Sequence, residues 1–269
     1  MDREGLNKDT TGDGGNATHF GFQTVGTSEK ASLVRGVFDQ VASRYDLMND
    51  LMSLGVHRLW KKALLDALAP RPDMRLLDMA GGTGDIACRF LARLPQIGQG
   101  TAKNTDSTAI VCDANTAMME IGRARALDRG VVSGLAWVCG DAEAIPLPER
   151  CMDAYTIAFG LRNVTHPEAA MAEAYRVLKP GGRFLCLEFS HVVLPVLDRL
   201  YDLYSFSVIP ALGGAVTGDV ESYRYLVESI RRFPTQKALA STMWRAGFER
   251  VSYRNLSGGI AALHSAWRI

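Results

Sequence analysis

A glycine-rich turn that follows an aspartate is the stretch of this sequence best suited to bind a ligand. Asp78 lies near the end of the apolar segment MRLLDMA, and the following residues, GGTGDIA, contain Gly82 and open a helix. Glycines let a backbone approach a ligand closely, and a helix N-terminus favours negative charge. The carboxylate of Asp78 at the strand end would repel a pyrophosphate and attract an amine or a sulfonium. We therefore expect a cofactor with a cationic group.

Two further acids stand at the same topological place on the next two strands. Asp113 ends the segment TAIVCD, where a carboxylate can accept hydrogen bonds from both hydroxyls of a ribose. Asp141 follows the segment GLAWVCG and precedes Ala142, where it can accept a bond from an adenine amino group. Open α/β sheets bind ligands at the carboxyl ends of their strands. Three acids in this register predict a nucleoside with a cationic tail, S-adenosylmethionine.

Each acid also has a plainer interpretation, because aspartate commonly ends a strand. Gly82-x-Gly84-x-x-Ala87 also satisfies the loose dinucleotide pattern, so an NAD-dependent dehydrogenase or a nonenzymatic nucleotide-binding module stays open. Preferential binding of S-adenosylhomocysteine or of NAD would separate these hypotheses.

The elements that must position these acids alternate between apolar strands and amphipathic helices from residue 74 to residue 190. Such alternation indicates a parallel sheet covered by helices on both faces. A helix at 235–247 and two last strands complete the pattern. The expected fold class is therefore α/β and Rossmann-like, and this ending fits that of a seven-stranded class I methyltransferase sheet.

The domain organisation follows from the segments outside this alternation. Residues 1–30 are rich in Gly, Thr, Asn and Asp and predict a flexible tail, and residues 31–269 predict a single domain. Helical periodicity from Leu33 predicts an N-terminal helical lid. Residues 191–233 are apolar but contain charges, and we interpret them as a helical substrate-side insertion after the fifth strand.

Composition excludes several classes of protein. The chain has 269 residues, 47% of them hydrophobic, and a net charge of +1, so no nucleic-acid partner is expected. The five cysteines lack metal-ligand spacing, which predicts reduced thiols and no metal site. No apolar run is long enough to span a bilayer and no signal pattern opens the chain, which predicts a cytoplasmic location.

A second polar pair follows the fourth strand. The segment FGLRNV places Arg162 and Asn163 where an apolar strand should end. Arg162 could supply a fixed cation to the site. It could equally form an arginine–carboxylate clasp that only closes the strand end.

Long segments of the chain resemble one family. YDLMNDLMSLGVHRLW (45–60), AGGTGD (80–85), FGLRNVTH (159–166), RVLKPGGRFLCLEFS (176–190) and ESYRYLVESI (221–230) are similar to blocks of the ubiquinone/menaquinone biosynthesis C-methyltransferases, which are class I methyltransferases. The resemblance runs from about Phe38 to the C-terminus. It implies methyl transfer from S-adenosylmethionine to a ring carbon of a polyprenylated quinol, either 2-polyprenyl-6-methoxy-1,4-benzoquinol, demethylmenaquinol or both.

The resemblance also implies which residues contact the cofactor. The family's contacts match Thr83, Asp113, Asp141 and Ala142. One position departs from the pattern: the family usually has a serine where this chain has Ala158, so that hydroxyl contact is lost.

Carbon methylation of a quinol requires an electron-rich ring, and so at least partial loss of a hydroxyl proton. We predict that Arg162 stabilises the phenolate while a water takes the proton. The guanidinium cannot itself serve as the base, because it stays protonated and so cannot accept a proton. Asn163 could orient that water or the second ring oxygen, and Tyr45 could close over the site as a lid. His191 is the alternative base, and His57 is read as structural.

The sequence leaves alternatives for the methyl acceptor and for the partners of the protein. A methyltransferase acting on another lipophilic or phenolic acceptor is the alternative, which analysis of C- against O-methylated product would separate. Tyrosines of the insertion could wall an isoprenoid groove. Peripheral contact with the inner face of the membrane through residues 191–216, and a homodimer or a complex of quinone-biosynthesis enzymes, are compatible with the sequence.

Overall fold

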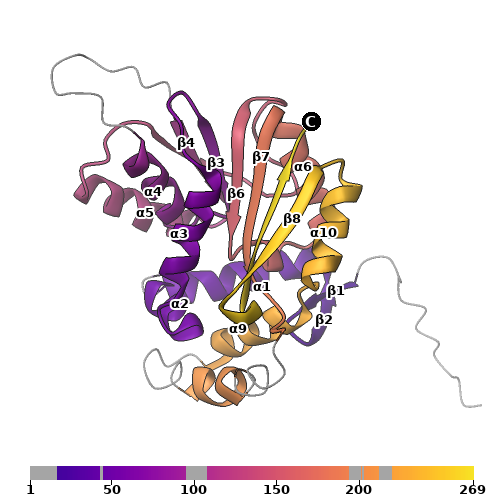
Figure 1. Cartoon of the computed structure of the whole chain (residues 1–269). Helices are drawn as coiled ribbons and strands as arrows, with labels where there is room; N and C mark the ends of the chain where they lie inside the picture. Colours follow the sequence, from indigo (N-terminus) through magenta and orange to yellow (C-terminus); the bar gives the residue numbers. More distant parts are fainter. Residues whose placement is uncertain (1–16, 43–44, 95–107, 194–200, 202, 212–219) are drawn as a thin grey trace, which may run out of the picture.

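A computed structural model describes residues 17–42, 45–94, 108–193, 201, 203–211 and 220–269 (Figure 1). Residues 95–107 and parts of the predicted insertion lie outside these ranges. Within them, no helix combines the length and the apolar composition that crossing a bilayer requires.

One mixed sheet with the strand order β5-β4-β3-β6-β7-β9-β8 organises the chain (Figure 1). Its strands are β3 (Arg75–Met79), β4 (Thr108–Asp113), β5 (Leu135–Cys139), β6 (Met152–Ala158), β7 (Leu178–Phe189), β8 (Glu249–Leu256) and β9 (Ala261–Trp267). The first five pair in parallel, whereas β9 runs antiparallel between β7 and β8. This arrangement confirms the predicted seven-stranded methyltransferase sheet.

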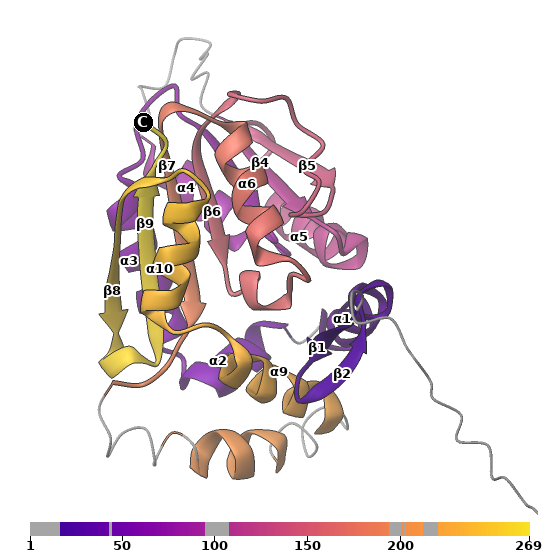
Figure 2. The ribbon, with the colours of Figure 1, turned by 90° about the vertical axis from the view of Figure 1, so that its right-hand side faces the viewer.

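Helices cover both faces of this sheet because its strands are apolar on both sides. Leu76 of β3 belongs to the core on one face and Leu77 to the core on the other. The first face carries α3 (His57–Leu68) and α4 (Asp85–Arg93), and α5 (Thr116–Asp128) packs on β4 and β5. The second face carries α6 (Pro167–Val177) and α10 (Gln236–Arg245) (Figure 2).

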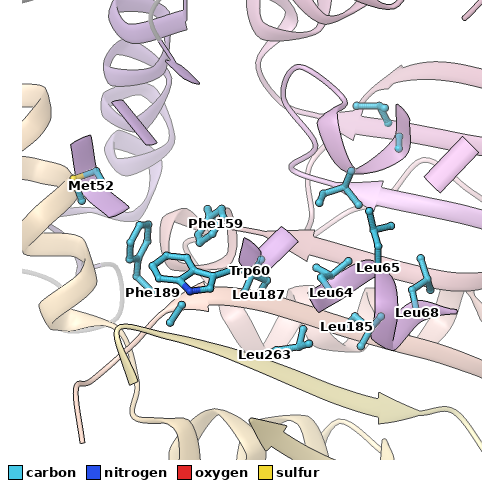
Figure 3. Packing of buried hydrophobic residues seen from close by; sticks show 14 of the residues in the cluster. Met52, Trp60, Leu64, Leu65, Leu68, Phe159, Leu185, Leu187, Phe189 and Leu263 are labelled. Atoms are coloured by element: carbon cyan, nitrogen blue, oxygen red, sulfur yellow. The ribbon is translucent and has the colours of Figure 1, made fainter. Parts of the chain in front are cut away.

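Aromatic packing fastens α3 to the sheet near the strand ends. Trp60 lies beside Phe159 and Phe189, with ring centroids 6.3 and 5.7 Å away (Figure 3). Farther along the helix, Leu64 and Leu65 are buried against the same face. The helix ends at Leu68, because the next residue takes a left-handed conformation and two prolines follow within four residues.

Three helices lie across the end of the sheet where the parallel strands terminate. They are α1 (Thr27–Val41), α2 (Tyr45–Ser53) and α9 (Val220–Arg232) (Figure 2). Two short turns, η2 (Leu161–Asn163) and η4 (Ser257–Gly259), follow β6 and β8. Helices α1 and α2 therefore occupy the place of the predicted N-terminal lid.

The predicted flexible tail is wrong for residues 17–30. This segment forms the hairpin of β1 (Ala17–Phe20) and β2 (Gln23–Gly26) and the first residues of α1. The Phe20 ring stacks on Tyr225 at 4.1 Å, and the Phe22 N–H donates to Glu228 of α9. These partners lie about two hundred residues away, so the local polar composition could not reveal them.

The described part of the predicted insertion is helical. Residues 203–211 form a helix whose middle, η3 (Tyr204–Val208), is a π-helix, and α9 closes the segment. Tyr201 and Tyr204 donate hydrogen bonds to the carbonyl groups of Met52 and Leu51, which fastens the insertion to α2.

Candidate active site

The glycine-rich turn after β3 has the close-approach geometry that its sequence predicts. Gly82 and Gly84 adopt positive φ angles of 52° and 71°, which favour glycine. A Cβ on Gly81 would lie 2.8 Å from the carbonyl oxygen of Asp78, so this position admits no side chain. The turn then enters α4, with Asp85 as the first residue of that helix.

Asp113 both faces the cavity and holds the turn in place. Its Oδ2 accepts a hydrogen bond from the Gly82 N–H at 2.8 Å, and its Oδ1 accepts one from the Asn115 N–H at 2.8 Å. Each carboxylate oxygen has a further lone pair, so the group can still accept from two hydroxyls. Burial raises the pKa of Asp113, and the backbone donors oppose that rise.

Asp141 lies after β5 in a more open position. Its Oδ1 accepts from the Glu143 N–H at 2.9 Å, which turns the chain so that the neighbouring Ala142 is buried. Glu143, to which the sequence reasoning assigned no role, accepts from the backbone N–H groups of Thr165 and His166. The loops after β5 and β6 are thereby joined.

A cavity of about 160 Å³ brings most of the predicted residues together. Five of them contribute to its wall: Gly82, Asp113, Asp141, Ala142 and Asn163. Its other side is formed by α1, through Ala31, Val34, Arg35 and Phe38. The sequence predicts a helical lid in this region from its apolar stripe, but it did not single out these four residues of α1 as part of the site.

Asp78 and Thr83 line a smaller cavity next to the first. The two cavities share Ala80 and Phe159. Asp78 is buried, and its Oδ1 accepts from the Thr156 hydroxyl at 2.8 Å, whereas its Oδ2 has no hydrogen-bond partner among the described residues. Burial raises the pKa of Asp78 to about 7. An unpaired buried carboxylate oxygen is the feature that a cationic ligand group would satisfy.

Arg162 does not stand free at the strand end. Its guanidinium is 2% exposed and forms a 2.7 Å ion pair with Glu188 of β7, which is 1% exposed. It also donates to the Phe159 carbonyl oxygen, and Arg162 is absent from the residues that line the two described cavities. This is the arginine–carboxylate clasp that the sequence left as the alternative to a cation facing the ligand. The Nε–H has no partner among the described residues.

The other candidates occupy different positions. Asn163 faces the cavity, and its Oδ1 accepts from the Tyr225 hydroxyl at 3.0 Å. The side chain of Tyr45, at the first residue of α2, lies outside the described part of the structure. His191 contacts the Phe233 carbonyl, and His57 pairs with Asp50 at 2.8 Å, so each imidazole has a polar partner and neither lines the two described cavities.

The donor set fits S-adenosylmethionine better than a dinucleotide. Acids lie at or just after the ends of the adjacent strands β3, β4 and β5, and the carboxylate next to the glycine-rich turn would repel a pyrophosphate. Ala158 lines the smaller cavity, where it can offer only a methyl group in place of the serine hydroxyl whose loss the sequence indicates.

Solved structures with the same arrangement include methyltransferases. The [4+2]-cyclase SpnF superposes with a TM-score of 0.62 at 17% identity, covering 87% of this chain and 94% of that one. A methyltransferase from Thermotoga maritima described as a possible histamine N-methyltransferase has a TM-score of 0.58 at 20% identity, covering 87% of this chain and 99% of that one. At these identities the likeness concerns the fold.

Sequence relatives extend over nearly the whole chain. The 2-methoxy-6-polyprenyl-1,4-benzoquinol methylase of Danio rerio is 53% identical, covering 95% of this chain and 85% of that protein. The ubiquinone/menaquinone biosynthesis C-methyltransferase UbiE of Dinoroseobacter shibae is 55% identical, covering 94% of this chain and 97% of that protein. A family model described as ubiE/COQ5 methyltransferase matches residues 24–268. The protein is thus an enzyme, and it belongs to the ubiE/COQ5 methyltransferase family.

Proposed function

We propose that this enzyme transfers the methyl group of S-adenosylmethionine to a ring carbon of a polyprenylated quinol, 2-polyprenyl-6-methoxy-1,4-benzoquinol or demethylmenaquinol, in ubiquinone or menaquinone biosynthesis. The observation that carries the proposal is one cavity lined by Asp113, Asp141 and Asn163, in a chain more than half identical to such methylases over almost its full length. Bound S-adenosylmethionine supplies an electrophilic methyl group on a sulfonium.

The acids and the turn bind and orient the cofactor in this proposal. Asp113 accepts from the ribose hydroxyls while it keeps the turn at Gly82 in place. Asp141 accepts from the adenine amino group, and Ala142 packs beside it. Asp78 offers its unpartnered Oδ2 to the amino group of the methionine part. Helix α1 covers the cavity and keeps water from the reacting centre.

The loop after β6 serves the quinol side. The Arg162–Glu188 pair holds this loop against β7, and the loop directs Asn163 into the cavity. Arg162 lines neither described cavity, so in this proposal its guanidinium stabilises the developing phenolate through its charge and not by direct contact, while a water takes the hydroxyl proton. Tyr45 remains the proposed lid residue.

Product analysis tests the reaction. The purified enzyme, given S-adenosylmethionine and each demethylated quinol, is expected to add one methyl group to a ring carbon, which nuclear magnetic resonance distinguishes from an O-methyl group. A strain that lacks the gene is expected to accumulate the same demethylated intermediate. An O-methylated product, or accumulation of neither intermediate, would overturn the assignment.

The proposal includes a place of action at the inner face of the membrane, since a polyprenylated quinol dissolves in lipid. Four apolar side chains of the hairpin and of the insertion are exposed: Phe22, Leu203, Phe206 and Val208. The rings of Phe22 and Phe206 stack at 6.4 Å, and Arg232 lies over Phe22. Apolar side chains with nearby cations suit an anionic bilayer surface.

Flotation with liposomes that contain anionic lipid tests this surface. Phe206→Asp is expected to abolish association, whereas Trp244→Asp, at a 70% exposed residue of α10, is expected to leave it intact. Equal flotation of both variants would remove the membrane role.

A homodimer or a complex of quinone-biosynthesis enzymes also belongs to the proposal. Light scattering of the purified protein, and of the protein isolated under native conditions, measures the molar mass of such an assembly.

A further inference from the structure

Lys61 is a buried cation that the reaction described so far does not use. It belongs to α3, and its side chain is only 5% exposed although lysine is among the residues most costly to bury. Its Nζ donates to Asp85 Oδ2 at 2.9 Å. An ammonium has three donors, and this is the one hydrogen bond recorded for it within the described ranges.

The position of Lys61 gives it access to a ligand. Lys61, Asp78 and Asp85 line the same small cavity beside the glycine-rich turn. The carboxylate of Asp78 keeps one buried oxygen, Oδ2, without a hydrogen-bond partner among the described residues, so the residues around this cavity include both a cation and an unsatisfied carboxylate. A ligand group complementary to both is a zwitterion with a carboxylate and an ammonium.

The charges allow Lys61 to take a second partner. Asp85 also accepts from Arg89 Nε at 2.8 Å, so its charge stays compensated when the Lys61 ammonium is shared. Burial alone would push the pKa of Asp85 upward, but the neighbouring Lys61 and Arg89 lower it. The lowered pKa keeps Asp85 an anion at neutral pH, and this anion holds Lys61 in place.

We propose that Lys61 binds the α-carboxylate of the methionine part of S-adenosylmethionine, opposite the ammonium that Asp78 accepts. The inference rests on the proposed function, because it names a further binding residue of that cofactor. It makes α3 part of the cofactor site, although this helix precedes the first strand of the sheet. The shared walls at Ala80 and Phe159 join this end to the cavity that holds the nucleoside acids.

Binding measurements with ligands that contain or lack the amino-acid part test the assignment. Isothermal titration compares S-adenosylhomocysteine with 5′-methylthioadenosine, which carries no carboxylate or ammonium. A charge-assisted hydrogen bond corresponds to about 10- to 100-fold in affinity. Lys61→Met is expected to weaken S-adenosylhomocysteine binding by that factor and to leave 5′-methylthioadenosine binding unchanged.

The next residue along the helix provides a matched control. Lys62 is 64% exposed and pairs with Asp66 on the outside of α3. Lys62→Met is expected to bind both ligands as the unaltered enzyme does. If Lys61→Met left both affinities unchanged, or reduced both equally, Lys61 would be a structural ion-pair partner and the inference would be overturned.

A comparison on the unaltered enzyme does not depend on how the variant folds. Decarboxylated S-adenosylmethionine is expected to bind 10- to 100-fold more weakly than S-adenosylmethionine. Equal binding of these two ligands would overturn the role of Lys61 while leaving the proposed function standing. Failure of the unaltered enzyme to bind any of the four adenosyl ligands would instead contradict the proposed function itself.

Discussion

Two ion pairs have similar N–O distances but different surroundings. The Arg162–Glu188 pair lies at the loop after β6, and the Lys61–Asp85 pair lies beside the glycine-rich turn. The first is sealed, with both side chains at most 2% exposed and the arginine anchored also to a backbone carbonyl. The second lines a cavity, its aspartate is 26% exposed, and a carboxylate oxygen nearby lacks a partner. A sealed pair holds a loop in place, whereas a pair open to a cavity can share its charge with a ligand.

The largest expected effect comes from breaking the sealed pair. Arg162→Met leaves a buried carboxylate uncompensated and is expected to lower the free energy of unfolding by about 3–5 kcal/mol. Adding Glu188→Gln removes that charge and is expected to restore most of the loss, which urea titration of the single and double variants measures.

The double variant also distinguishes a structural role of Arg162 from a role in the methyl transfer. Recovered stability with recovered turnover would limit Arg162 to holding the loop. Recovered stability without turnover, with S-adenosylhomocysteine binding intact, would establish the cation as part of the chemistry. If Arg162→Met alone left the stability unchanged, the Arg162–Glu188 pair would not hold the loop in place, and the difference between the two pairs would not exist.

The next largest effect concerns the unpartnered carboxylate beside the open pair. The folded-state pKa of Asp78 is raised from 3.8 to about 7, so between these values the folded protein binds the proton more tightly than the unfolded chain does. The free energy of unfolding should therefore fall as pH rises through this window, by about 1.4 kcal/mol per unit, and level off above pH 7. Asp85 and Lys61 are the charged groups that act on Asp78.

Asp78→Asn is expected to remove this slope. The variant should be more stable than the unaltered enzyme at pH 8 and bind S-adenosylhomocysteine more weakly, because the amide cannot pair with the ammonium. Urea unfolding at pH 5, 6, 7 and 8 provides the measurement. Parallel profiles for the two proteins would mean that Asp78 is already ionised without ligand.

The smallest effect on stability and on cofactor affinity is expected at Arg89, which flanks the Lys61–Asp85 pair. Arg89 is 40% exposed and is the second partner of Asp85, so Arg89→Gln should lower the free energy of unfolding by less than about 1 kcal/mol. Cofactor affinity should stay within threefold of the unaltered enzyme, since Lys61 remains in place. A loss as large as that of Lys61→Met would mean that Asp85, rather than Lys61, governs the site.

The sheet and the acids at its strand ends were accessible from the sequence because both are local signals. An apolar run that ends in Asp113, or a turn that requires Gly82, reports on a few neighbouring residues. The hairpin at 17–26 was missed because its stability comes from Tyr225 and Glu228 of α9. The pairing of Arg162 with Glu188 was left as an alternative, since the two residues are 26 positions apart and meet only where β6 and β7 lie side by side.

By itself the sequence determined the alternation of strands and helices, the close-approach turn and the acids that end β3 and β4 and follow β5. These depend on side-chain periodicity and on backbone conformations that few residues can adopt. Only the tertiary structure decided which charges are neutralised and which stay available, because burial and pairing depend on elements distant in sequence. Hence Arg162 pairs with Glu188 inside the protein, while Lys61, on a helix before the sheet begins, reaches the cavity beside Asp78.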